Sequence, residues 1–120
     1  MTAIEKTCQF FESRGLSMTR EMENYIRCGY AIFTPQAVLM ARPINVDKGF
    51  QDWPLSGGDC WYVFWACGRG LEWFIKQAPE PKPYVAWHRW NDFAHGRLPE
   101  MRVYNWSRVT ELVHSTLKNN

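Results

Sequence analysis

The run of residues 60–67 constrains the fold more than any other feature of the chain. It reads CWYVFWAC, carries no charge, and lies between Gly57-Gly58 and Gly68-Arg69-Gly70. An uncharged run rich in aromatic residues and bounded by glycines predicts a β-strand. Because both faces are apolar, we expect both to be covered by other elements. Strict alternation places two sets of side chains on opposite faces: Cys60, Tyr62, Phe64 and Ala66 on one, and Trp61, Val63, Trp65 and Cys67 on the other.

Apolar periodicity predicts two helices before this strand. The first ends before Gly15, and the second lies between Ser17 and Gly29. A hairpin around Pro35-Gln36 and a long loop over residues 43–58 follow. The apolar stripe of the first helix is Ile4, Cys8 and Phe11, and that of the second is Met18, Met22, Tyr25 and Ile26. The two strands of the hairpin are Tyr30–Thr34 and Ala37–Arg42.

The second half of the chain predicts a helix, two strands and a final helix. The first helix carries Leu71, Phe74, Ile75 and Ala78 on one stripe and ends at a proline-rich segment. The strands are Tyr84–Trp90 and residues 101–106. The final helix is capped by Ser107, with Val109, Leu112, Val113 and Leu117 facing inward.

This order of elements predicts an α+β fold. A chain of 120 residues suits one domain, here residues 1–120. We expect a mostly antiparallel sheet of about five strands, two N-terminal helices, one crossover helix and a C-terminal helix. The sequence has no signal-peptide pattern and no long apolar span, and its four cysteines lack a CxxC spacing. We therefore expect a cytoplasmic protein with reduced thiols and no membrane partner.

Cysteine chemistry is weakly indicated. Cys60-Trp61-Tyr62 resembles the opening of the CHAP-type amidases, which implies His88 or His95 as a base and Asp92 as its orienting group. A cysteine in a buried strand is instead typical of an inert thiol. Zinc ligation by Cys60, Cys67, His88 and His95 is disfavoured, because neither spacing of seven fits a tight metal site and the two cysteines point oppositely. We expect no metal and no bound cofactor.

The turn Gly68-Arg69-Gly70 has the position of an anion site, between a strand and a helix N-terminus. With the order of elements around it, the turn resembles the acyl-CoA loop of GNAT acyltransferases. The family pattern is Q/R-x-x-G-x-G/A, of which Gly68 and Gly70 match the glycine pair, whereas Trp65 stands where Gln or Arg is expected. The resemblance implies a GNAT-like acyltransferase, or a degenerate relative, with Gly68, Arg69 and Gly70 contacting acyl-CoA.

Exposed aromatic and basic residues are the candidate partner contacts. Phe50 and Trp53 lie in the long loop, and further arginines and tryptophans alternate from residue 87 onward. Such residues anchor protein partners or stack on single-stranded nucleic acid. The formal charge of +2 disfavours nucleic acid. The predicted contact residues are Phe50, Trp53, Arg89, Trp90, Arg97 and Arg102.

No combination of residues satisfies a nucleophile–base–orienter pattern. We therefore expect a small non-catalytic binding or structural protein that acts through protein contacts, with a second copy of the chain among the candidate partners. The tryptophan content resembles that of small accessory proteins of bacteriophages and mobile elements. This implies a virion component or an inhibitor of a host factor, in the host cytoplasm or the virion. Acyl-CoA binding and weak binding of single-stranded nucleic acid are the alternatives.

Overall fold

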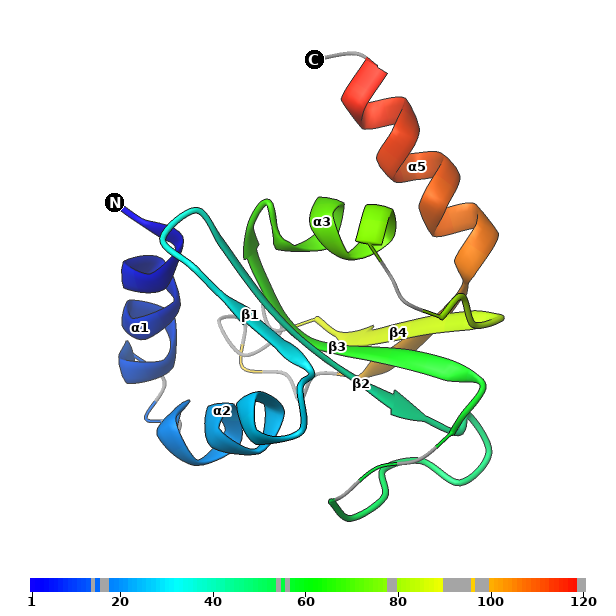
Figure 1. The fold of residues 1–120 in the computed structure, drawn as a ribbon, viewed down its shortest axis with the longest axis horizontal. Coiled ribbons are helices and arrows are strands. Elements are labelled where there is room, and N and C mark those ends of the chain that lie inside the picture. The colour runs from blue at the N-terminus through cyan, green and yellow to red at the C-terminus, as the bar shows by residue number, and fades with distance from the viewer. Residues whose placement is uncertain are drawn as a thin grey trace.

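Five strands form a mixed sheet within the part of the chain that the structure describes (Figure 1). The computed structural model describes residues 1–13, 15, 18–53, 55, 57–77, 80–89, 96 and 100–118. The strands are β1 (Ala31–Phe33), β2 (Ala37–Ile44), β3 (Cys60–Gly68), β4 (Tyr84–His88) and β5 (Met101–Asn105). They lie side by side in chain order. Strands β3 and β4 are parallel, and the other neighbouring pairs are antiparallel.

Helices cover both faces of the sheet. Helices α1 (Ala3–Ser13) and α2 (Met18–Arg27) pack on one face, and α3 (Gly70–Gln77) and α5 (Trp106–Lys118) pack on the other (Figure 1). Helix α3 is the crossover between the parallel strands β3 and β4. The predicted α+β fold is thereby confirmed, with two N-terminal helices, one crossover helix and a C-terminal helix.

Strand β3 separates two apolar layers. Its residues Trp61 and Val63 pack with Phe74 of α3 and Val109 of α5. On the opposite face, the core residues Ala3, Tyr25, Val38 and Met40 join helices α1 and α2 to the sheet, and Phe64, Trp65 and Cys67 pack against them. The prediction that both faces of this strand are covered is therefore confirmed.

A β-bulge at Phe64 corrects the predicted faces of β3. Met40 pairs with Trp65, and the next residue, Ala41, pairs with Val63, so that Phe64 is an extra residue in β3. An extra residue shifts the alternation of all the side chains that follow it. Ala66 consequently lies in the layer of α3, whereas Trp65 and Cys67 lie in the layer of α1 and α2. The predicted placement of these three residues was wrong.

The helical stripes also differ from the predicted ones. In α1 the buried residues are Ala3, Thr7 and Phe11, and Ile4 and Cys8 are only half-buried. Thr7 is drawn inward because its hydroxyl accepts a hydrogen bond from Trp65 Nε1 at 2.8 Å. In α2 and α5, two predicted core residues, Ile26 and Leu112, are exposed.

The ends of several elements differ from the predicted ones. Strand β2 continues to Ile44, so that the long loop begins two residues later than predicted. Pro43 lies inside the strand, paired with Trp61. Helix α5 begins at Trp106, so Ser107 belongs to the helix and is not its cap. No helix in the described ranges combines the length and the apolarity that a membrane crossing requires.

Candidate ligand-binding site

Strands β3 and β4 run together over only part of their length. Their parallel pairing extends from Cys60 with Tyr84 to Val63 with Trp87, and β3 then continues for five further residues. Within the described residues, no strand pairs with this extension on the β4 side. Strand β4 ends at His88, one residue beyond its last pair, so the β3–β4 pairing ends where the β2–β3 register changes at Phe64.

The end of the β3–β4 pairing leaves a notch, a small cavity, at the carboxyl ends of the parallel pair. Its volume is about 190 Å³. Helix α3 contributes Leu71 from its first turn, so the notch lies beside the helix N-terminus. Ligands of open sheets commonly bind at such carboxyl ends. The lining residues are Val63, Phe64, Trp65, Ala66, Leu71, Trp87 and His88.

A tyrosine–histidine pair borders the notch. The hydroxyl of Tyr62 lies 2.6 Å from His88 Nδ1. Phe50 packs edge-on against the Tyr62 ring, with 4.7 Å between centroids. Burial lowers the pKa of His88 and raises the pKa of Tyr62. Burial therefore favours the uncharged form of each side chain, and the tautomer of the imidazole determines which of the two donates the hydrogen bond.

Steric constraints explain why both Gly68 and Gly70 of the Gly68-Arg69-Gly70 turn are glycines. A Cβ on Gly68 would lie 2.3 Å from the carbonyl oxygen of Gln36, and one on Gly70 would lie 2.2 Å from that of Val38. The turn thus packs directly on the backbone of the β1–β2 hairpin. Gly68 also has a φ of 66°, which glycine adopts readily.

The same turn borders a second hollow of about 450 Å³. Two cationic side chains, Lys6 of α1 and Arg69, line it together with Thr2, Pro35, Gln36 and Gly68. Arg69 is exposed, and its backbone N–H points to the Gln36 carbonyl at 3.4 Å. Binding of an anion at Gly68, Arg69 and Gly70 stays a prediction. The fold places a second cation, Lys6, in the same hollow.

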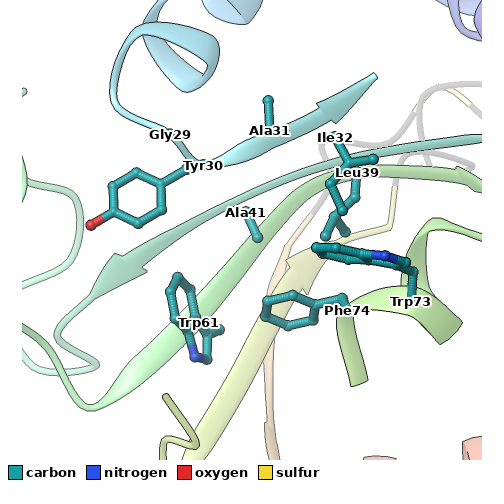
Figure 2. Close-up of a pocket in the computed structure, with 9 residues that line it drawn as sticks. All are labelled: Gly29, Tyr30, Ala31, Ile32, Leu39, Ala41, Trp61, Trp73 and Phe74. Carbon is teal, nitrogen blue, oxygen red and sulfur yellow. The ribbon is translucent and has the colours of Figure 1, made fainter. Parts of the chain in front are cut away.

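An apolar groove lies on the α3 face, beside the edge strand β1 (Figure 2). Its volume is about 320 Å³. The indole of Trp73 faces Ile32 and Leu39 across the groove, and 44% of this residue is exposed. The lining residues are Gly29, Tyr30, Ala31, Ile32, Leu39, Ala41, Trp61, Trp73 and Phe74.

The predicted partner residues differ in their exposure to solvent. Phe50 is half-exposed, whereas Trp53 is half-buried against Tyr25 and the α1–α2 layer. Arg89 and Arg102 are exposed, and Arg102 lies on β5. Trp90 and Arg97 lie outside the described residues. Trp87 of the aromatic belt stacks on Tyr104, with 4.5 Å between centroids, inside the α5 layer.

The cysteines form no reactive or metal-binding group among the residues described. Cys60 is fully buried, and burial together with Asp59 raises the pKa of its thiol to about 11. The bulge brings Cys60 and Cys67 to the same face, contrary to the prediction, but seven residues of strand separate them by about 20 Å. His95 and Asp92 lie outside the described residues, and no group of metal ligands occurs within them. The four cysteines are free thiols.

Two features of this region were not predicted: the Tyr62–His88 contact and the burial of Arg42 in β2. The contact joins residues 26 positions apart, so no local pattern could reveal it. Arg42 did carry a signal, because an arginine inside the apolar run AVLMARPI is unusual. Comparisons of the chain with protein-family models, with curated proteins and with solved structures found no significant match.

Proposed function

We propose that the protein binds an acyl thioester of the acyl-CoA type, as the resemblance to GNAT acyltransferases implies. The observation that carries the proposal is that the pairing of the parallel strands β3 and β4 ends at the bulge of Phe64, while β3 continues beyond it. We infer that a linear ligand lies along β3 where β4 no longer pairs with it. The Gly68-Arg69-Gly70 turn and helix α3 follow directly along the chain.

The chemistry of the notch suits the arm of coenzyme A. This arm contains two amide groups, and main-chain groups of an unpaired strand edge bind amides as an added strand would. The side chains that surround the notch are mostly apolar, which suits the methylene groups between the amides and the acyl group. The edge of β3 beyond Val63, which no described strand pairs on the β4 side, therefore offers both kinds of contact that the arm needs.

The phosphates of the ligand would lie beside the turn. Lys6 and Arg69 line the hollow next to Gly68 and supply two positive charges. The first turn of α3 adds the partial positive charge of a helix N-terminus. The Ala66 backbone in the notch is two residues from Gly68, a distance of about 7 Å along a strand. The turn that would hold the phosphates is therefore close to the notch along the chain.

Calorimetry with acetyl-CoA tests this proposal. We expect saturable binding that Arg69→Glu and Lys6→Glu weaken by about tenfold, because a phosphate contact to each cation is lost. Arg102→Glu is the matched control, since it makes the same charge change at an exposed position on β5. We expect it to bind as the wild type does.

A second titration tests the notch itself. Adenosine 3′,5′-bisphosphate lacks the acyl arm, and we expect it to bind more weakly than acetyl-CoA. Equal affinity would show that the notch contributes nothing. The absence of binding by the folded protein at millimolar acetyl-CoA would overturn the proposal.

The groove beside β1 supports a second candidate, which is the non-catalytic protein-binding role. Trp73 is a large exposed residue at its centre, and tryptophan is a frequent anchor of protein interfaces. The outer edge of β1 is unpaired among the described strands and can accept a further strand. We expect Trp73→Ala to abolish association, either with a second copy or with a purified partner, without lowering the melting temperature by more than a few degrees. Sedimentation of wild type and variant over a concentration series checks self-association.

A further inference from the structure

Arg42 is buried in β2 without a counter-ion. Only 9% of the residue is exposed, and no carboxylate within the described chain forms an ion pair with it. Its Nη2 donates a hydrogen bond to the Gln51 carbonyl oxygen, and its Nε has no hydrogen-bond partner among those residues. Burial of a charge without a partner is unfavourable, so the guanidinium is held in a state that an added acceptor would stabilise.

Aromatic rings hold the guanidinium in place. Its Cζ atom lies 4.7 Å from the centroid of the Trp53 ring and 5.4 Å from that of Phe50. Stacking of this kind stabilises a cation but leaves its in-plane N–H groups available to an acceptor. Trp53 is itself fixed by Tyr25, whose ring lies 5.1 Å away in a T-shaped arrangement. The direction of the Arg42 side chain is therefore set before any ligand arrives.

Arg42 lines a hollow of about 660 Å³ between helix α2 and the long loop. The apolar part of its wall comes from Phe11, Phe50, Trp53 and Phe64. Its charged residues besides Arg42 are Arg20, Glu21 and Asp52, and Asn24 and Gln51 complete the lining. An arginine thus lies at the wall of a hollow whose other surfaces are largely aromatic.

We propose that this hollow binds a monocarboxylate with an apolar body. A carboxylate oxygen would accept a hydrogen bond from the Arg42 guanidinium, and the body would pack on the aromatic wall. The two acidic residues, Glu21 and Asp52, disfavour phosphate, because it carries more negative charge than a carboxylate. A free organic acid and the C-terminal carboxylate of a peptide share this chemistry.

The proposal does not depend on acyl-CoA binding. Phe64 lines both the notch and this hollow, but Arg42 lines only the hollow. The probes below contain no thioester and no phosphate ester. Either site can therefore fail its test while the other passes.

Titration of the full chain with phenylacetate tests the proposal, with phenylacetamide as the neutral isostere and inorganic phosphate as the second control. We expect saturable binding of phenylacetate by calorimetry and a rise in melting temperature that grows with its concentration. We expect the amide and phosphate to bind at least about tenfold more weakly, because neither combines a single negative charge with the apolar body. N-acetylphenylalanine, compared with its amide, tells whether a peptide end is accepted.

Arg42→Met supplies the matching variant. We expect it to lose its response to phenylacetate, because methionine has no donor for a carboxylate. Arg42→Lys keeps the charge and should keep part of the response. Equal binding of acid and amide by the wild type, or an unchanged phenylacetate affinity of Arg42→Met, would overturn the proposal. The wild-type comparison decides the matter even if the variant fails to fold.

Discussion

Gly70 is the residue at which helix α3 touches the β1–β2 hairpin. An added Cβ would lie 2.2 Å from the Val38 carbonyl oxygen and 3.3 Å from the Leu39 Cβ. Because the first of these atoms belongs to the backbone of a buried strand, the contact cannot be relieved by a side-chain rotation. We expect Gly70→Ala to lower the free energy of unfolding by about 2 kcal/mol or more, measured by urea denaturation.

Gly29 provides the control for this prediction. Its φ is 76°, and no atom lies within 4 Å of the position that a Cβ would take. Gly29→Ala therefore introduces only the backbone strain of a left-handed residue, about 1 kcal/mol. An equal or larger effect at Gly29 would show that the close approach at Gly70 is unimportant.

His88 predicts a dependence of stability on pH. Burial lowers the pKa of its imidazole in the folded state, so the unfolded chain takes up a proton first as the pH falls. The stability that the neutral imidazole contributes is complete above its ordinary pKa of about 6.5 and is lost as the pH falls below that value. We expect the free energy of unfolding to decrease between about pH 7 and pH 5.5.

A His88→Gln variant isolates this contribution, because glutamine keeps a polar side chain beside Tyr62 but does not titrate. We expect its denaturation midpoints to change less over the same pH range. The same slope in both proteins would assign the pH dependence to other groups.

At the scale of the elements, local patterns predicted most of the fold. An uncharged, aromatic-rich run between glycines identified β3, and the 3.6-residue period identified the helices on either side. The bulge at Phe64 was missed because it arises from pairing with β2 and leaves no mark in the local sequence. The exposure of Leu112 was not predicted for a related reason. Periodicity indicates which residues can face a core, but it does not indicate how far along the helix the core extends.

The candidate site was less predictable than the fold. The position of the Gly68-Arg69-Gly70 turn followed from the strand and helix around it. The notch requires the end of the β3–β4 pairing, and the Arg42 hollow requires helix α2 to lie opposite the long loop. Both depend on contacts between residues that are far apart in the sequence, which propensity and periodicity do not describe.

The long loop is held to the sheet by buried polar contacts. Lys82 is only 5% exposed, and its Nζ donates to the Gly58 carbonyl oxygen at 2.8 Å. Asp59 accepts a hydrogen bond from the backbone N–H of Val46 at 3.0 Å. We expect Lys82→Met to destabilise the protein by about 1–3 kcal/mol, because it leaves a carbonyl oxygen without its donor.

Hydrogen exchange localises this effect. We expect faster exchange in residues 45–58 of the Lys82→Met variant, with the amides of β2 unchanged. Lys76→Met is the control, because Lys76 forms an exposed ion pair with Glu72, and such pairs contribute less than about 1 kcal/mol. Uniformly faster exchange throughout the sheet would contradict a local role for Lys82.

At the scale of the whole molecule, Cys60 reports on global unfolding. It is fully buried under both neighbouring strands, and its thiol has a pKa of about 11. Cys8, Cys28 and Cys67 are half-buried. We expect a thiol reagent at neutral pH to modify Cys60 last, at a rate set by the unfolding equilibrium.

Peptide mapping after timed labelling measures this order of reaction. Labelling of Cys60 should accelerate in urea in proportion to the unfolded fraction, whereas labelling of Cys28 should change little. Early modification of Cys60 in the absence of denaturant would reveal local opening of β3.

The extra residue at Phe64 also determines where the length of β3 can change. Without Phe64 the strand would alternate regularly, and Trp65 and Cys67 would stay in the layer of α1 and α2, with the contact between the Trp65 indole and Thr7 preserved. Elsewhere in a paired strand, the loss of one residue exchanges the two faces of everything beyond it. The bulge residue is therefore the position of β3 that descendants of this chain can lose with the least change to the two faces of the strand.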